Sequence, residues 1–525
     1  MSRYPVRSTL AAKAAAPAQG GLAPEVSEII ALGLATGISF ILYWGGVYDI
    51  ANLFIPLMIG IVGAAGMWQL IRRSPANVWT PLFALRASAV VFLSIGGLVT
   101  ELGSEATREV VLSLYAYSPE EGAKTQTIFI AGYFVTILAI KLASVLRPLP
   151  PPEASGGVVF TQKATLRLGI LFLALGFSYT FLIQLPLLIN RSNLVLPGTL
   201  ALMFSALSAV GTFLVALWAV ERRGAAYLLV GVLLLVQLLI SLILLEKSSV
   251  MTALLLVGLA FLLHKVSLYR IAGLAVALGV LLSFVTPAVT QGRLLHAQIY
   301  GDLDGGSVGE RLGYSIEYLE GYRLPSLPGD ESSSFVRLHY VSPSAFAVTQ
   351  YDVGLGSDVI SNGFSALIPR ALWPDKPVIS DIGTDFNEMI SGFNTSALGV
   401  VVFADAYWNF GWAGLLIFIP AGFFLWWAAW NARRIVETRD WIMMPFVLIT
   451  FRIAMSVDNF LVLSWLTPAV ISVILLFVLR FAKHGILATL KSSLSPGVPV
   501  HDAPDGVGPR KGWRGRRLRG TSIEG

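Results

Sequence analysis

A stiff, cationic segment lies late in the chain, at Pro369-Arg370-Ala371-Leu372-Trp373-Pro374-Asp375-Lys376-Pro377. Its prolines restrict the backbone, so Arg370, Trp373 and Lys376 are presented in a rigid stretch. Arginine binds phosphate through two parallel hydrogen bonds, and lysine binds it as a point charge. The segment is therefore a candidate phosphate-binding site. The alternative is a structural turn, in which Arg370 and Asp375 pair with neighbouring groups.

Three further cations lie in or beside strongly apolar stretches of the sequence. Arg452 interrupts one such stretch, and a cation inside a membrane usually faces a cavity or a partner. Lys247 follows Glu246 at the end of another, where it either snorkels to the headgroups or contacts a phosphate. Arg86 lies near the inner end of a third. We assign a function to Arg452, expect Arg86 to snorkel in a structural role, and leave both alternatives open for Lys247.

Two residues are candidate general bases. Asp405 lies where the chain re-enters an apolar stretch, and it shares one helical face with Asn409 if this part is helical. A carboxylate in such half-dry surroundings suits proton abstraction, although an aspartate that caps a helix beside an aromatic belt is the alternative. His339 lies beside Arg337, and histidine titrates near neutral pH. A loop histidine without a function is the alternative there.

The composition defines the environment of these residues. The chain has 525 residues, of which 55% are hydrophobic and 13% charged, with a mean hydropathy of +0.73. Soluble domains carry about 25% charged residues, so this composition predicts a polytopic membrane protein. The net charge of +6 comes largely from short loops and the basic tail, which argues against a nucleic-acid partner. With no cysteine and five scattered histidines, we expect no metal site and no cofactor.

Twelve apolar windows approach the roughly 20 residues that a spanning helix needs. They cover residues 28–46, 52–71, 81–100, 127–146, 168–189, 199–220, 226–245, 249–264, 271–290, 412–430, 441–457 and 460–482. The eighth window is short, and Arg452 interrupts the eleventh. The expected fold is thus an all-α polytopic membrane protein of about 12 transmembrane helices with a partly helical extracytoplasmic loop.

The distribution of loop cations predicts the orientation of these helices. With the N-terminus inside, the inner short loops and helix ends carry thirteen Lys and Arg residues, whereas the outer ones carry four. Both termini are then cytoplasmic, and the long hydrophilic segment lies outside. The expected organisation is an N-terminal tail (1–27), nine helices (28–290), a large outer loop (291–395), a re-entry segment with three helices (396–482) and a basic tail (483–525).

The outer loop is expected to be a small, partly helical cap. It holds thirteen Asp and Glu residues against six Lys and Arg, so anions must be bound by a few well-placed cations. Ser307 and Glu310 have the spacing of a capping box, which predicts a helix that ends near Gly321. Further short helices are predicted from Ser357 to Pro369 and from Thr384.

The segment PRALWPDKP, followed about thirty residues later by FADAYWNFGWAG, resembles the motifs of the Wzy-type oligosaccharide repeat-unit polymerases, which share their architecture with O-antigen ligases. The matching positions in this chain are Pro369, Arg370, Leu372, Trp373, Pro374, Lys376, Pro377, Tyr407, Asn409, Phe410 and Gly411. Many relatives carry glutamate where this chain has Asp405. Many also carry Ser-Arg where this chain has Lys247-Ser248-Ser249.

The resemblance implies a bacterial inner-membrane glycosyltransferase of the GT-C type, which joins undecaprenyl-diphosphate-linked oligosaccharides into O-antigen or exopolysaccharide at the periplasmic face. A flippase and a chain-length regulator of the same pathway would be its partners in the bilayer. Arg370, Lys376, Arg452 and Lys247 would then bind the diphosphate, with Arg337 as a further substrate contact, and Asp405 or His339 would serve as the base. Trp373 and Tyr407 would stack on sugars, beside Asn409. The alternatives are a ligase of similar architecture and, from a different class, a lipid-linked oligosaccharide flippase or transporter.

Overall fold

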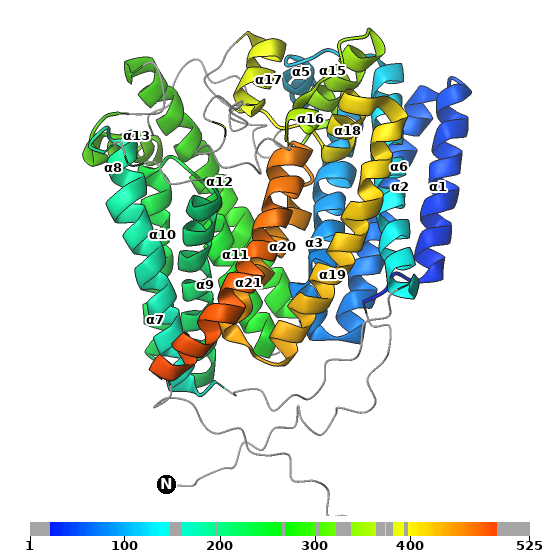
Figure 1. Cartoon of the computed structure of the whole chain (residues 1–525). Helices are drawn as coiled ribbons and strands as arrows, with labels where there is room; N and C mark the ends of the chain where they lie inside the picture. The colour runs from blue at the N-terminus through cyan, green and yellow to red at the C-terminus, as the bar shows by residue number, and fades with distance from the viewer. Residues whose placement is uncertain are drawn as a thin grey trace, which may run out of the picture.

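The chain folds into a bundle of roughly parallel helices, with short helices gathered at one end (Figure 1). The computed structural model describes residues 22–146, 160–192, 194, 198–264, 268–300, 305–321, 338–363, 373, 382–392 and 397–490. Ten helices in this part are long and apolar enough to cross a membrane, and no strand occurs in it. The predicted fold class is confirmed: this is an all-α polytopic membrane protein.

The helices of the bundle are α1 (Val26–Trp44), α2 (Tyr48–Arg73), α6 (Pro119–Leu146), α7 (Gln162–Tyr179), α9 (Gly198–Arg222), α10 (Ala226–Ile243), α11 (Ser248–His264), α12 (Leu268–Tyr300), α19 (Phe418–Glu437), α20 (Met444–Met455) and α21 (Thr467–Leu490). One further span combines α3 (Pro81–Ser88), the π-helical segment η2 (Ala89–Ile95) and α4 (Gly96–Leu102).

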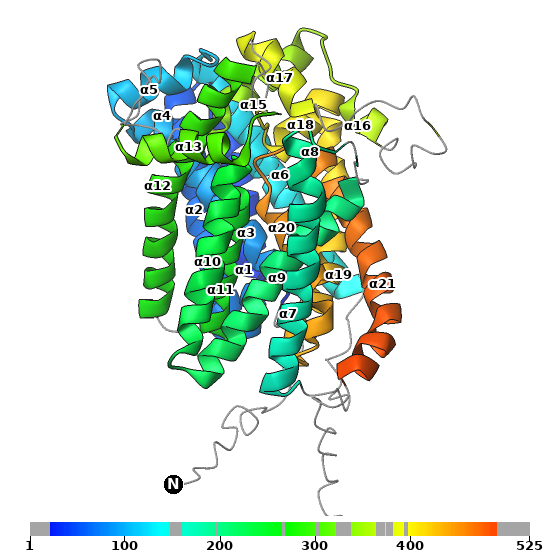
Figure 2. The same ribbon diagram turned by 90° about the vertical axis from the view of Figure 1, so that its left-hand side faces the viewer.

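All twelve apolar windows lie on helices, but two of those helices are short. Ser249–Leu263 and Trp441–Met455 fall below the length of a membrane span, and they correspond to the eighth and eleventh windows. Conversely, α12 continues to Tyr300, past the expected start of the loop at residue 291. The last turns of α12 therefore project toward the short helices at that end of the bundle (Figure 2).

The helices form two groups that the C-terminal helices join. The first group contains α1, α2, α3 and α6, and the second contains α7 and α9 to α12 (Figure 1). Helix α19 packs on α6, whereas α20 packs on both α3 and α9. Because α20 touches both groups, it forms the wall between them.

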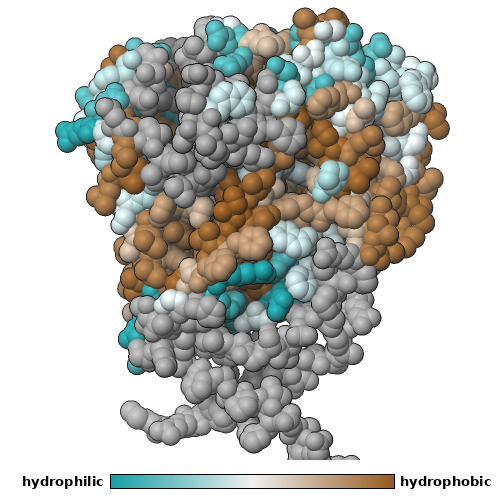
Figure 3. Space-filling model, in the orientation of Figure 1, coloured by the Kyte–Doolittle hydropathy of each residue, from teal (hydrophilic) through white to brown (hydrophobic). Residues whose placement is uncertain are grey.

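The flank of the bundle is strongly apolar, as expected for a surface in contact with lipid (Figure 3). Helix α1, for example, exposes Ile30, Leu34 and Ile41 at 56%, 64% and 71%. In water such a continuous apolar patch would be unfavourable. In a bilayer its side chains contact lipid tails, which are also apolar.

The short helices at one end are α5 (Glu105–Leu112), α8 (Leu185–Leu188), α13 (Val308–Leu319), α15 (Val341–Asp352), α16 (Val359–Gly363), α17 (Ile382–Ser391) and α18 (Val402–Phe410). The capping box predicted for α13 is confirmed, since Ser307 Oγ accepts from the Glu310 N–H and the Glu310 carboxylate accepts from the Ser307 N–H. The helix ends at Leu319, two residues before Gly321, which adopts a φ of +99°.

The other helices of this cap differ from the predictions in detail. The helix expected after Ser357 is present as α16, and its continuation beyond Gly363 toward Pro369 lies outside the described residues. The helix expected at Thr384 begins at Ile382 instead. Helix α15 was not predicted, because its Ser-Pro-Ser start reads as a loop. Its small residues are nevertheless buried against α6 and α18, so packing compensates for a weak local signal.

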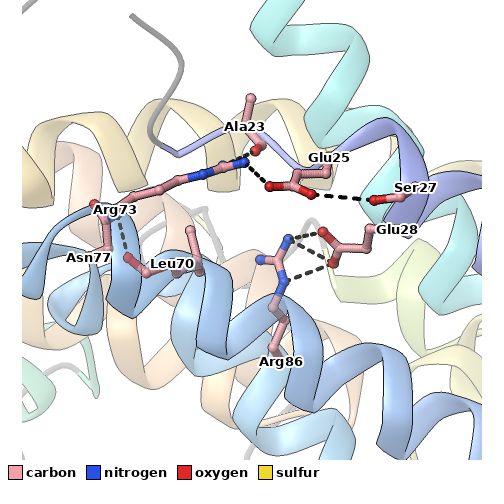
Figure 4. Close-up of polar contacts among 8 residues, drawn as sticks. All are labelled: Ala23, Glu25, Ser27, Glu28, Leu70, Arg73, Asn77 and Arg86. Carbon is pink, nitrogen blue, oxygen red and sulfur yellow. Dashed lines mark hydrogen bonds and ion pairs between the residues drawn. The ribbon is translucent and has the colours of Figure 1, made fainter. Parts of the chain in front are cut away.

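The cation at Arg86 does not snorkel, contrary to the prediction, but forms a buried ion pair. Its side chain is 1% exposed and makes two 2.9 Å hydrogen bonds, from Nε and Nη2, to the carboxylate of Glu28 on α1 (Figure 4). Gly66 makes room for it, because a Cβ there would come within 2.5 Å of Arg86 Nε. The pair therefore ties α3 to α1 across α2.

Breaking this pair is expected to destabilise the bundle strongly. Arg86→Met or Glu28→Met alone leaves one uncompensated buried charge and should cost about 3–5 kcal/mol of unfolding free energy, whereas the double variant should cost less than the sum. Thermal unfolding of the detergent-solubilised protein measures this. The exposed Arg433–Glu437 pair, at 2.7 Å, is the matched control and should contribute less than about 1 kcal/mol. Additive single and double variants at Arg86 and Glu28 would contradict the interpretation.

Candidate functional site

Asp405 is the most completely enclosed of the predicted site residues. It lies on α18 and is 0% exposed. Its Oδ2 accepts a 2.8 Å hydrogen bond from the backbone N–H of Leu461, at the start of the last helical segment, and its Oδ1 accepts a 3.2 Å bond from Asn409. A carboxylate at a helix N-terminus satisfies an otherwise unpaired donor. This geometry favours a positioning role for Asp405, because its side chain is buried and each of its oxygens accepts a hydrogen bond from within the protein.

Asn409 and Tyr407 extend the same network. Asn409 shares a helical face with Asp405, as predicted, and its Oδ1 accepts a 3.0 Å bond from the N–H of Ile360 on α16. The hydroxyl of Tyr407 donates a 2.9 Å bond to Asp352 at the end of α15. The structure thus places Asp405, Tyr407 and Asn409 in one hydrogen-bond network on α18. We call these three residues the clamp, because they connect α15, α16 and the last helix to α18.

His339 is likewise held by backbone groups. Its Nδ1 lies 2.9 Å from the carbonyl of Gly96, and its Nε2 accepts a 3.1 Å bond from the N–H of Ser342 in the first turn of α15. Gly96 permits this approach, since a Cβ there would lie 2.0 Å from the Leu338 carbonyl. Because Nε2 is an acceptor, Nδ1 carries the proton. Burial lowers the pKa of His339 to about 4, so the ring is neutral and both of its nitrogens are occupied.

The predicted intramembrane cation Arg452, by contrast, lines a cavity. The cavity has a volume of about 340 Å³ and lies between α20 and the second helix group. Its walls on α10 and α11 come from Gln237 to Glu246 and from Ser249 to Thr252, so it lies at the end of the bundle that carries the short helices (Figure 2). Arg452 is exposed, and its guanidinium has no hydrogen-bond or ion-pair partner among the described residues.

The lining of this cavity is rich in polar groups for a membrane interior. Besides Arg452, it contains Tyr179, Thr180, Gln184, Ser205, Ser208, Gln237, Glu246, Ser249 and Thr252. Gln237 is 3% exposed, and its Nε2 has no hydrogen-bond partner in the described structure. Unsatisfied donors are rare in native proteins and call for a water or a ligand. The cavity is therefore suited to a hydroxyl-rich or anionic molecule.

The backbone is irregular on two walls of the cavity. The π-helical segment η3 (Thr180–Gln184) comes just before Pro186, which has no N–H with which to continue the helical ladder. It turns Thr180 and Gln184 toward the cavity, and such π-segments often lie at functional sites. Leu245 adopts a φ of +53°, a costly conformation for a leucine, directly before Glu246. Strain of this kind favours a functional role for the α10–α11 turn.

Two arginines of the expected loop stabilise that turn. Arg311 on α13 donates from Nε to the carbonyl of Ile243 at 2.9 Å, and Arg293 on α12 donates to the carbonyl of Leu245 at 2.7 Å. Helix C-termini leave carbonyls unpaired and carry partial negative charge, so both cations are well placed there. Arg293 also interacts electrostatically with Glu246. The two arginines hold the wall of the cavity.

Lys247 lies next to this wall, and the structure brings it close to Asp458. Asp458 belongs to the connection between α20 and the last helix. Burial raises its pKa, whereas a hydrogen bond from Tyr340 and the charge of Lys247 act in the opposite direction. The connection also contains Val457, whose carbonyl accepts a 2.9 Å bond from the N–H of Val402 on α18. It therefore lies between the clamp on α18 and the cavity.

The predicted site residues thus fall into two places. Arg452 and Lys247 lie at or beside the cavity. Glu246, which the sequence identified only as the residue before Lys247, lies there as well. Asp405, Tyr407, Asn409 and His339 lie in the packed layer of short helices. Trp373 is 42% exposed, and Arg337, Arg370 and Lys376 lie outside the described residues. The sequence did contain a sign of this cavity. Gln184 and Gln237 are polar residues inside apolar windows, where a side chain of this kind needs a polar partner.

The fold and the cavity together define a polytopic membrane protein with a polar cavity at one end of its bundle. Comparison with known proteins adds no relative: no family model matches the chain, and no match occurs among the curated proteins or the solved structures. In the described residues no three His, Asp or Glu side chains are grouped to bind a metal ion.

The neutral His339 predicts a pH dependence of stability. Its folded pKa of about 4 lies below the roughly 6.5 of an unfolded histidine, so between these values the unfolded state binds more protons. Its contribution is complete above about pH 6.5 and is lost as the pH falls toward 4, to a total on the order of 3 kcal/mol. Melting of the wild type and of His339→Asn between pH 7.5 and 4.5 tests this. The variant should have the shallower pH slope, and equal slopes would refute the assignment.

Proposed function

We propose that this protein is a membrane glycosyltransferase that polymerises undecaprenyl-diphosphate-linked oligosaccharide repeat units into O-antigen or exopolysaccharide, at the periplasmic face of a bacterial inner membrane. The observation that carries the proposal is the polar cavity beside α20, whose lining combines a carboxylate and several hydroxyl groups with an arginine that has no partner among the described residues. The resemblance of the PRALWPDKP and FADAYWNFGWAG segments to the Wzy-type polymerases supports the same activity.

The size and position of the cavity fit a lipid-linked glycan. A volume of about 340 Å³ lies at the lower end of small-molecule sites, which hold about 300–1,000 Å³. It accommodates a diphosphate and the sugar attached to it, while the rest of the glycan extends toward the short helices. The polyprenyl tail remains in the bilayer beside the bundle.

Arg452 and Lys247 bind the diphosphate in this proposal. The leaving group gains negative charge as its bond to the sugar breaks, and preorganised cations in a water-poor site stabilise that charge strongly. Arg452 has no competing partner in the described structure, so its donors are available. The cations of the expected outer loop, Arg337, Arg370 and Lys376, would complete the site from the other side, with Trp373 stacking on sugar.

Glu246 is the base that fits the geometry best. Asp405 and His339 are enclosed and use both of their polar atoms within the protein. Glu246 instead lines the cavity together with Arg452. Within reach of an acceptor sugar hydroxyl, its carboxylate removes the proton as the new bond forms.

The proposed reaction is a single displacement at the anomeric carbon. The acceptor hydroxyl gives its proton to Glu246, and its oxygen forms a bond to the anomeric carbon of the donor glycan. The bond from that carbon to the diphosphate oxygen breaks, and undecaprenyl diphosphate leaves with the electron pair. Holding both lipid-linked substrates at one surface supplies much of the rate, because proximity lowers the barrier by several kcal/mol.

Arg452→Gln tests the diphosphate contact. The loss of one charge-stabilising donor should reduce polymerisation by about 10²-fold or more, and the lipid-linked glycans should shift to single repeat units on a gel. Arg108→Gln, which removes an exposed cation from α5, is the matched control and should leave the chain-length distribution unchanged. Long polysaccharide made by Arg452→Gln at normal protein levels would contradict the proposal. A complete loss of surface-directed repeat units would indicate a flippase instead.

The choice of base is tested by comparing two carboxylates. Glu246→Gln should reduce polymerisation by about 10²–10⁴-fold, as for the loss of a general base, without lowering the melting temperature. Asp405→Asn keeps an oxygen that can accept from the Leu461 N–H, so it should lose stability of about 1 kcal/mol and only a small part of its activity. Glu109→Gln on α5 is the control for Glu246. The opposite ranking, with Asp405→Asn inactive but stable, would return the role of base to Asp405.

A further inference from the structure

A second cavity lies at the opposite end of the bundle from the short helices. It has a volume of about 450 Å³, and its polar lining consists of Asn431, Arg434, Thr438, Asp440, Arg480 and Lys483. These residues belong to the last turns of α19, to the turn that follows it, and to the second half of α21. In Figure 3 hydrophilic surface gathers near the lower end of this otherwise apolar flank. The cavity takes no part in the proposed polymerisation.

The charge of this cavity favours an anion. Three cations face a single carboxylate, which leaves a formal charge of +2 on the lining. Lys483 Nζ pairs with Asp440 Oδ2 at 2.5 Å, so this lysine is partly neutralised. Arg480 has no ion-pair partner among the described residues, and Arg434 lies over the ring of Trp430, 5.5 Å from its centroid. Two guanidinium groups, whose forked donors suit phosphate oxygens, thus remain available.

One oxygen in the cavity indicates what accompanies the anion. Asp440 Oδ1 is buried and accepts no hydrogen bond in the part of the chain that the structure describes. Such an acceptor, beside two arginines, suits a ligand in which a hydroxyl group lies a few bonds from a phosphate. A phosphate ester without any hydroxyl group would leave this oxygen unsatisfied.

The surroundings of the cavity indicate where the ligand comes from. On α21 the side chains of Phe477, Val478 and Phe481 are 54%, 47% and 83% exposed, directly beside Arg480. An apolar surface of this kind on the flank of the bundle contacts acyl chains. Arg434 and Trp430 lie near the end of α19, and aromatic and cationic side chains at the ends of membrane spans commonly contact lipid headgroups. A molecule in the cavity can therefore hold its phosphate between the arginines and its tails along α21.

We infer that this cavity binds the headgroup of an anionic glycerophospholipid that carries hydroxyl groups. The phosphodiester lies between Arg434 and Arg480, and a headgroup hydroxyl donates to Asp440 Oδ1. The bound lipid would join the ends of α19 and α21, which the Lys483–Asp440 pair already connects.

Native mass spectrometry of the detergent-solubilised full chain tests this inference with phosphatidylglycerol and phosphatidylcholine of identical acyl chains. Phosphatidylglycerol should be retained preferentially by the wild type, and Arg434→Gln/Arg480→Gln should weaken its binding by about tenfold or more. Arg433→Gln removes a cation from the same helical turn, but this arginine pairs with Glu437 and does not line the cavity. It should bind phosphatidylglycerol as the wild type does.

Three results would overturn the inference. An equal loss in Arg433→Gln would show a general effect of surface charge, and equal retention of phosphatidylcholine would show that the cavity does not select the anion. Soluble glycerol 3-phosphate that competes with the lipid at equal concentration would show that the tails are unnecessary and that the ligand is not a lipid. Elution volume and melting temperature of each variant establish that it is folded. Polymerisation is not part of the readout, so the two proposals fail independently.

Discussion

Inside a membrane-spanning bundle, polar groups find no water to bond, so each must be satisfied by another part of the protein. Most buried polar groups described above obey this constraint through contacts between distant segments. Arg86 pairs with Glu28, Asp405 accepts from Leu461, and Arg311 and Arg293 donate to the last carbonyls of α10. These contacts determine which helices lie next to each other. They also make the exceptions informative, since an unsatisfied group in such a bundle indicates a place built for something else.

Among the exceptions, two buried atoms without a hydrogen-bond partner in the described structure line cavities at opposite ends of the bundle, Gln237 Nε2 in one and Asp440 Oδ1 in the other. Each cavity is also lined by an arginine with no ion-pair partner among the described residues, Arg452 in the first and Arg480 in the second. The first contains a carboxylate and hydroxyl groups and is suited to chemistry on a sugar phosphate. The second has three cations against one carboxylate, which pairs with Lys483, and it lies beside exposed apolar side chains, so it is suited to holding an anionic lipid. Both cavities contain an arginine that suits phosphate. The residues around that arginine distinguish the cavity proposed to bind the substrate from the cavity proposed to bind a lipid headgroup.

The connection between α20 and the last helix links the first cavity to the layer of short helices. Its Leu461 N–H is held by Asp405, its Val457 carbonyl is held by Val402, and its Asp458 interacts with Tyr340 and Lys247. The conformation of the FADAYWNFGWAG segment is therefore transmitted to the cavity through one short connection. Under the proposed function, this connection would let the enclosed Asp405 influence a site that it does not line.

Local signals in the sequence predicted the parts of the structure that depend on neighbours along the chain. The apolar windows predicted the helices, because a span needs only a run of apolar residues, and the Ser307–Glu310 spacing predicted the start of α13. Helix α15 escaped prediction because its stability comes from packing on α6 and α18. Arg86 was expected to snorkel because it lies near the inner end of its apolar stretch. Its partner, Glu28, lies 58 residues away, so no local pattern connects the two.

The sequence by itself thus determined that this is an all-α membrane protein and that Arg452 interrupts an apolar stretch. Only the tertiary structure decided which carboxylate shares a space with that arginine. Asp405 and Glu246 are equally acidic as residue types, and each lies near the end of an apolar stretch. The fold encloses the first against the N-terminus of the last helix and places the second on the wall of a cavity. The physical reason is that access and partners are set by contacts between distant segments, which no local pattern records.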